Sequence, residues 1–335
     1  MSGSYLSSLA HKLAVPLIHY PYKIWGYGEE IGLAALLAAA RGTRESRYSE
    51  FVHGLLKAWV AARPRISNAD HVAPGLVLLE VYSKVRDARL LSQACKLAEW
   101  FTQVPRGPFG AGLHRADQSL FSSFIYVDCM AVDAPFLGKF AEVTGDGYYY
   151  RLGAELIFSH VQALQDQNSG LFSHVYNASQ NASNGVFWGR GNGWALLGLV
   201  STLEQLPQDE PARPFLHRSL EKLAAGLLSL QDGSGHWHTV LNDPQSYTET
   251  SLAAIFAYGL RRAVRSNLIP TAYEKPASAA FEAFIKEIDS DGSILGVSQA
   301  TPPGDHAHYC RVPRGGIYPW GHGPALLAVL QQMET

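Results

Sequence analysis

A repeated alternation constrains the fold of this chain more than any other feature of its sequence. Six short segments rich in Gly, aromatic and polar residues each stand before an apolar run with helical periodicity: WGYGEE (25–30), SNADHVAPG (67–75), YVDCM (126–130), FWGRGNGW (187–194), SYTETS (246–251) and YPWGHGP (318–324). One marker residue from each lies 42, 58, 62, 59 and 72 residues from the next: Gly28, Asp70, Asp128, Arg190, Glu249 and Gly321. Two helices fit in each interval, so the sequence predicts six helix hairpins in which every second helix begins with an unusual segment.

The hairpin pattern predicts an all-α protein with the architecture of an (α/α)6 barrel. If six hairpins close into a ring, one helix of each pair lies inside, and the inner helices begin at one rim around a shared cavity. The alternative is an open α-solenoid, which has no reason to place polar and aromatic residues at one end of every second helix. No Gly/Ser-rich or Pro-rich linker divides the chain. We therefore expect a single barrel domain over residues 1–335, with residues 1–22 as an N-terminal extension.

The composition argues against several classes of function. The chain has 335 residues and a formal net charge of -2, so it offers no basic surface for nucleic acid or an anionic membrane. No apolar run reaches the length of a transmembrane helix. The N-terminal stretch lacks the basic start and the cleavage site of a signal peptide. We expect a cytoplasmic protein, with secretion as the alternative, that is a monomer or a weak homodimer.

Cysteine and histidine spacing gives no sign of a metal or a redox centre. The three Cys residues lie far apart without CxxC spacing, which is neither a disulfide framework nor a zinc cluster. His236 and His238 have the H-x-H spacing of metal ligands, but no third ligand stands near them in the sequence. The motifs for a nucleophilic Ser, a P-loop or a dinucleotide are also missing. We expect no metal and no cofactor.

The segment FWGRGNGW has the residue types that bind an acidic carbohydrate. Arg190 can hold a carboxylate with two hydrogen bonds, and Trp188 and Trp194 offer flat faces to sugar rings. The start of the following helix attracts anions, and Gly residues would let the backbone approach a ligand closely. The alternative is a Gly-rich corner between helices in which both Trp residues serve only packing.

Two Asp residues in the repeated segments are candidates for acid–base chemistry. Asp128 and Asp70 each stand before an apolar helix, where an Asp is either an N-cap or a functional acid. If both face one cavity, apolar walls and mutual repulsion would keep one of them protonated, as a general acid requires. Asp133 is expected to be structural or to pair with a His or Arg. His114 and His174 stand in loops that the pattern places on the same side.

The ordered set of segments resembles the unsaturated rhamnogalacturonyl hydrolases of glycoside hydrolase family 105, and more distantly the unsaturated glucuronyl hydrolases of family 88. The resemblance extends from about residue 25 to residue 330 and rests on WGYGEE, DHVAPG, YVDCM with PFLGKF, GLFSHVYN, FWGRGNGW, GHWHTVLNDPQSYTETS and YPWGHGP. It implies an (α/α)6 barrel that removes a 4,5-unsaturated uronic acid from the non-reducing end of lyase-generated oligosaccharides. In that reaction the vinyl ether is protonated at C4 and water adds at C5.

The resemblance also implies roles for particular residues. Asp128 matches the acid/base, and Asp70 matches a second carboxylate that orients water or supports the first. The predicted substrate-binding residues are His174, Arg190, Trp194, Tyr126, His114 and Trp188. Two positions depart from the family pattern: Tyr126 stands where a Trp is usual, and Cys129 replaces a small or hydroxyl residue. The alternatives are another carbohydrate enzyme on the same barrel (a β-glucuronidase, lyase or epimerase) or a carbohydrate-binding scaffold without catalysis.

Overall fold

The computed structural model describes residues 2–24, 26–66, 71–115 and 122–334. Six helices form an inner ring: α2 (Tyr27–Thr43), α4 (Gly75–Val85), α6 (Asp133–Thr144), α8 (Gly189–Gln205), α10 (Thr250–Arg265) and α13 (Pro319–Met333). The outer helices are α1 (Gly3–His19), α3 (Ser46–Ala61), α5 (Ala88–Thr102), α7 (Tyr148–Leu164), α9 (Arg213–Leu230) and α11 (Glu274–Ile285). The prediction of an all-α (α/α)6 barrel is confirmed.

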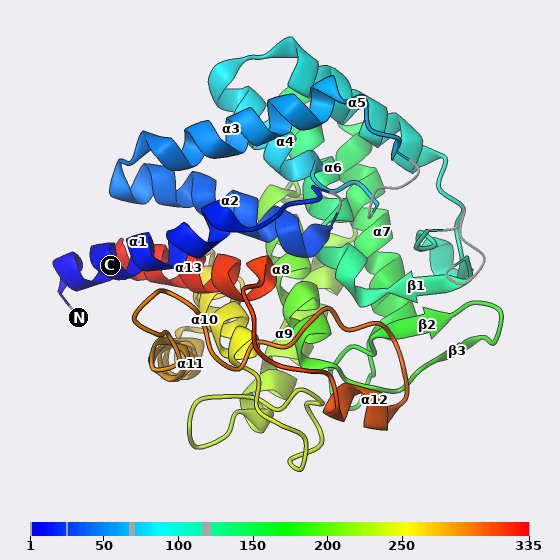
Figure 1. Ribbon diagram of the computed structural model, residues 1–335. Helices are drawn as coiled ribbons and strands as arrows, with labels where there is room; N and C mark the ends of the chain where they lie inside the picture. The colour runs from blue at the N-terminus through cyan, green and yellow to red at the C-terminus, as the bar shows by residue number, and fades with distance from the viewer. Residues whose placement is uncertain (1, 25, 67–70, 116–121, 335) are drawn as a thin grey trace.

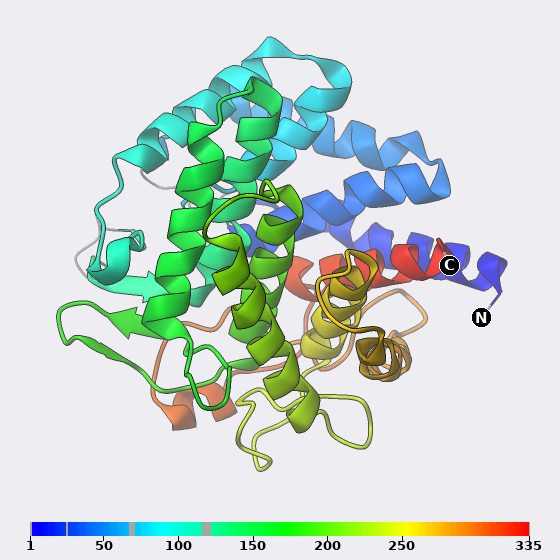
Figure 2. The same cartoon turned by 180° about the vertical axis from the view of Figure 1, so that it is seen from behind.

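The last inner helix closes the ring. Helix α13 packs against α2 and against α10, and α1 packs on both α13 and α2 (Figure 1). The two chain ends consequently lie side by side, as both views show (Figures 1 and 2). The segment expected as an N-terminal extension therefore contains α1, which is the outer partner of α13 and part of the barrel. Its core-facing residues recur at helical spacing: Leu6, Leu9, Leu13 and Leu17.

Inner and outer helices differ in how much of their surface is buried. In α8, every residue from Gly189 to Leu203 is buried, so the helix is covered on all sides. In α9, burial is confined to one stripe, in which Leu216, Leu220, Leu223 and Leu227 recur every three or four residues. Among the described residues, no helix has both the length and the hydropathy needed to cross a membrane.

Short elements at one end of the barrel hold the loops together. Strands β1 (Phe124–Tyr126), β2 (Val175–Asn177) and β3 (Ala182–Ser183) form a small antiparallel sheet in that order. Other short elements of the described residues are the 3-10 turns η2 (Pro108–Gly110) and η3 (Val127–Ala131) and the one-turn helix α12 (His306–Cys310), while the turn η4 (Thr271–Tyr273) connects α10 to α11. Directly after β1, the Val127 N–H donates to the carbonyl of His174 at 3.0 Å. The sheet therefore sets η3 beside the segment that carries His174.

Candidate active site

Asp128 occupies a buried turn in front of α6. It lies in η3, whereas α6 begins only at Asp133, so Asp128 is not the N-cap of that helix. Its side chain is fully buried, and its Oδ2 lies 3.2 Å from Nε2 of His174. Within the described part of the chain, neither carboxylate oxygen makes an aligned hydrogen bond. The contact with His174 is therefore a close approach that leaves both oxygens able to bond to a ligand.

A hydrogen-bond chain fixes the orientation of the His174 ring. The Tyr309 hydroxyl lies 2.6 Å from Nδ1 of His174 and accepts a hydrogen bond from Nδ2 of Asn184 at 3.0 Å. Burial raises the pKa of Tyr309, so its phenol stays protonated and donates to Nδ1. With the phenol O–H on Nδ1, we assign a ring proton to Nε2, the nitrogen that faces Asp128.

Sequence reasoning missed Tyr309 and Asn184. Tyr309 belongs to α12, and 135 residues separate it from His174 along the chain. Neither residue lies in one of the six repeated segments, and a contact between such distant loops leaves no local pattern. Asn184 directly follows β3 and lies seven residues after GLFSHVYN, but nothing in its neighbourhood marked it.

Arg190 is engaged by the protein on both of its terminal nitrogens. Nη1 donates to Oε1 of Glu249 at 2.9 Å and to the Ser298 hydroxyl at 2.8 Å. Nη2 donates to the Gln299 carbonyl at 2.7 Å and to the Thr301 hydroxyl at 3.0 Å. Since both pairs of terminal N–H groups are engaged, a two-fold grip on a ligand carboxylate would have to replace these bonds. The geometry favours a role for Arg190 in positioning loops, and direct binding of a uronate stays a prediction.

Three indole rings and Arg190 line a cavity of about 340 Å³. The cavity opens where α2, α8 and α13 begin, and its walls include Trp188, Trp194 and Trp320, the cations Lys23, Arg115 and Arg190, and the carboxyl group of Glu29. The guanidinium of Arg190 lies 4.7 Å from the ring centre of Trp188 and 5.8 Å from that of Trp320. Aromatic faces and cations together suit a sugar that carries a carboxylate.

Asp128 does not line this cavity. The link between them is the His174 ring, which contacts the carboxylate of Asp128 and lies 4.4 Å from Trp188, centre to centre. A sugar in the cavity is therefore separated from the carboxylate by Trp188 and its neighbours. Asp70, the other predicted carboxylate, lies outside the described residues.

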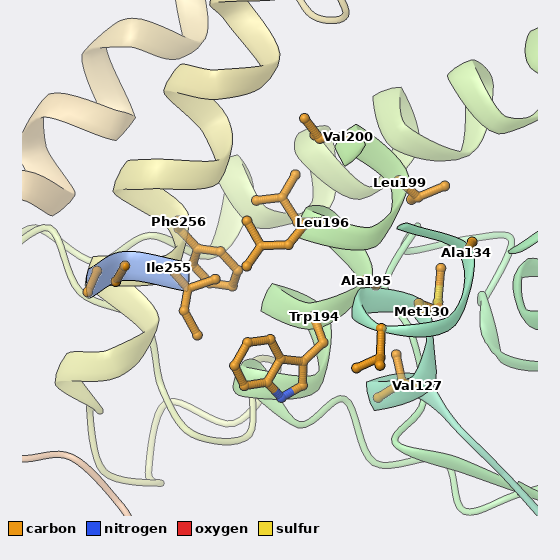
Figure 3. Close-up of a cluster of buried hydrophobic side chains, with 14 of the residues drawn as sticks. Val127, Met130, Ala134, Trp194, Ala195, Leu196, Leu199, Val200, Ile255 and Phe256 are labelled. Atoms are coloured by element: carbon orange, nitrogen blue, oxygen red, sulfur yellow. The ribbon is translucent and has the colours of Figure 1, made fainter. Parts of the chain in front are cut away.

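The glycines of FWGRGNGW serve helix packing. They fall inside the first turns of α8, and a Cβ on Gly191 would lie 2.7 Å from Cγ1 of Val127. A Cβ on Gly193 would lie 2.6 Å from Cγ2 of Ile255 in α10. The expectation that these glycines let backbone approach a ligand is wrong, because the neighbouring atoms belong to η3 and α10. Figure 3 shows Trp194 between the same two elements, with Val127 on one side and Ile255 on the other.

The remaining predicted residues lie behind Asp128. The His114 ring packs 4.4 Å from that of Tyr126, and Tyr126 meets His174 edge-on at 5.7 Å. Burial is the largest of the causes that hold the pKa of His114 well below its usual range, so its imidazole is neutral. Asp133 accepts from Nδ1 of His71 at 2.6 Å, which confirms the expectation that it pairs with a His or Arg.

Comparison with known proteins assigns this geometry to a family. A family model described as Glycosyl Hydrolase Family 88 matches residues 10–335. The unsaturated rhamnogalacturonyl hydrolase YesR of Bacillus subtilis is 29% identical over 316 residues, which are 91% of this chain and 89% of that protein. An unsaturated 3S-rhamnoglycuronyl hydrolase of an Alteromonas species is 27% identical over 214 residues, 58% of this chain and 52% of the other.

Solved structures share the fold over the whole chain. A protein from Salmonella enterica described as a possible member of the GH105 family superposes with a TM-score of 0.92 at 24% identity, covering 100% of this chain and 95% of that one. The unsaturated glucuronyl hydrolase of Bacillus sp. GL1 superposes with a TM-score of 0.79 at 17% identity, covering 97% and 96%. At these identities the likeness concerns the fold.

Proposed function

Since this chain belongs to glycosyl hydrolase family 88, we propose that it removes a 4,5-unsaturated uronic acid from the non-reducing end of lyase-generated oligosaccharides. The observation that carries the proposal is the buried carboxylate of Asp128, which lies 3.2 Å from Nε2 of His174 and accepts no aligned hydrogen bond among the described residues. The relatives named as unsaturated rhamnogalacturonyl and rhamnoglycuronyl hydrolases support the same substrate class.

In the proposed mechanism, Asp128 carries out both proton transfers. The protonated carboxyl gives its proton to C4 of the vinyl ether, which leaves positive charge on C5 and the ring oxygen. The carboxylate then takes a proton from the water that attacks C5. The resulting hemiketal opens, and the neighbouring sugar leaves as the aglycone. Asp70 is proposed to orient this water.

His174 is proposed to stabilise the ionised form of Asp128 between the two proton transfers. Its Nε2–H lies 3.2 Å from Oδ2 and needs only a small rotation to donate a hydrogen bond to the carboxylate. Tyr309 holds the ring in the tautomer that can do this. Because Asp128 does not line the cavity, the reaction also needs a path that brings the sugar past Trp188 to its carboxyl group.

The cavity is proposed to recognise the acidic sugar. Trp188 and Trp194 would stack on sugar rings, and Lys23 and Arg115 would attract the carboxylate from the cavity wall. His114 and Tyr126 are proposed to shape the floor behind Asp128. We also propose a single domain, a cytoplasmic location with secretion as the alternative, and a monomer or weak homodimer. Cell fractionation and light scattering test the last two.

One absorbance assay tests the reaction and separates it from a lyase. Unsaturated disaccharides from pectin, ulvan, xanthan and glycosaminoglycans would be incubated with the protein, and the ultraviolet absorbance of the double bond followed. A hydrolase of this kind removes the absorbance, whereas a lyase acting on an intact chain creates it. Asp128→Asn should lower kcat by about 10²–10⁴-fold while the thermal midpoint changes little. Near-normal turnover of that variant would refute the role of Asp128. If the absorbance stays unchanged with every disaccharide, a carbohydrate-binding scaffold without catalysis is favoured.

A further inference from the structure

A cluster of three side chains beside Asp128 takes no part in the proposed proton transfers. The Sγ of Cys129 lies 3.9 Å from Nε2 of His71 and 3.7 Å from Nδ1 of His114. All three ligand atoms lie within 4.8 Å of one another, and all three residues are buried. Each comes from a different segment: the loop before α4, the loop after η2, and η3 itself. The cluster therefore joins three parts of the chain that surround the proposed catalytic Asp.

The two sulfur–nitrogen distances are close to those of a tetrahedral zinc site. With Zn–S near 2.3 Å and Zn–N near 2.0–2.1 Å, a tetrahedral angle sets sulfur and nitrogen about 3.6 Å apart. The two sulfur–nitrogen distances exceed this by no more than about 0.3 Å.

A carboxylate orients one of the ligands from behind. Nδ1 of His71 bonds to Oδ2 of Asp133 at 2.6 Å, which directs the opposite nitrogen, Nε2, toward the sulfur. Histidines that bind a metal commonly make such a hydrogen bond to a carboxylate through the second ring nitrogen. The pair is almost completely buried, so its geometry is fixed before any ion arrives.

We propose that His71, His114 and Cys129 bind one zinc-class divalent ion, with Asp133 as the residue that positions His71. Binding releases the thiol proton of Cys129 to solvent and leaves the fourth coordination position for water. Two imidazoles and a thiolate select zinc-class ions over magnesium or calcium, which prefer oxygen ligands.

The test must exclude binding at a second cluster of possible metal ligands, which lies nearer the surface. Asp243, His306 and Cys310 also lie close together, but they are half-buried or exposed. The double variant Cys95→Ser/Cys310→Ser is therefore used as the parent, because it keeps Cys129 as its single thiol. Wild-type protein is measured beside it.

Zn²⁺ and Co²⁺ are titrated into the metal-free parent against a chromophoric chelator. The parent should bind one equivalent, and the Co²⁺ form should show thiolate-to-metal charge-transfer absorbance that excess Mg²⁺ does not abolish. Cys129→Ser in the same parent should lose that absorbance and bind the ion at least about 10-fold more weakly. Asp133→Asn should keep the absorbance and bind the ion about 10- to 100-fold more weakly. If circular dichroism shows that Asp133→Asn does not fold, the Cys129→Ser variant alone tests the proposal. A parent that binds no ion, or a Cys129→Ser variant that binds as tightly as the parent, overturns the proposal.

Discussion

Replacing Tyr309 by Phe removes one oxygen atom from the chain of hydrogen bonds that leads to Asp128. The substitution deletes the 2.6 Å bond to His174 and the 3.0 Å bond from Asn184, and it leaves the ring of residue 309 in place. Each lost bond costs about 0.5–1.5 kcal/mol, so the free energy of unfolding should fall by about 1–3 kcal/mol.

The effect on catalysis follows from the tautomer of His174. Without the phenol, nothing among the described contacts holds the proton on Nε2, and a ring protonated on Nδ1 turns a lone pair toward Oδ2 of Asp128. Loss of a preference of about 1–2 kcal/mol corresponds to a fall in kcat of about 5- to 30-fold. KM should stay within about twofold, because Tyr309 does not line the cavity.

Two measurements on Tyr309→Phe check the reasoning. Nitrogen-15 NMR of labelled histidine reports which ring nitrogen of His174 carries the proton, and the absorbance assay gives kcat and KM. Tyr176→Phe is the control: it deletes a part-buried 2.6 Å hydrogen bond from Tyr176 in β2 to Asn181 and touches neither His174 nor Asp128 through its hydroxyl. A Tyr309→Phe variant that keeps the Nε2–H tautomer and full kcat would refute the argument.

Three further substitutions test other parts of the structure. Arg190→Lys should keep an ion pair with Glu249 but lose the hydrogen bonds of Nη2. The free energy of unfolding measured in urea should therefore fall by about 1–3 kcal/mol, whereas a raised KM with unchanged stability would indicate direct binding of the uronate. Gly191→Ala should cost about 1–3 kcal/mol of stability by overpacking, and Val127→Ala in the same chain should recover part of it; no loss in the single variant would contradict the contact. Burial raises the pKa of Glu30 from 4.5 to about 8, so the folded state keeps a proton that the unfolded state has lost, and stability falls as pH rises from about 4.5 to about 8. Glu30→Gln should therefore gain stability relative to wild type between pH 5 and pH 8 in urea unfolding, and a constant difference would argue against this titration.

The barrel was predictable because a special segment recurs before every second helix. FWGRGNGW opens the inner helix α8, whereas the outer helix α9 follows no such segment and shows a single apolar stripe. This alternation distinguishes inner from outer helices without any knowledge of contacts. Helix α1 escaped this reasoning because no special segment precedes it, and its inner partner, α13, lies at the other end of the chain.

The small sheet and the contacts it makes were not predictable in the same way. Strands of two or three residues are too short to show an alternating pattern. The sheet nevertheless decides which residue meets Asp128, because its register brings Tyr126 opposite Val175 and so places His174 next to η3. The residue types at the site could be read from the sequence, and their pairing depended on these few hydrogen bonds.

The Arg190–Glu249 pair shows that the sequence motifs predicted the charged residues of the site but not the residues that they contact. The sequence placed both residues at the beginning of inner helices, on one rim, where a cation and an anion can each face a ligand. In the folded chain Arg190 stands at the positive end of α8, where a second positive charge is unfavourable. Its burial requires a nearby anion, and Glu249 supplies it while also accepting from the Ser298 N–H at 3.0 Å. Because Arg190 and Glu249 are both buried and bonded to each other, their two segments are joined on the Trp188 side of the cavity.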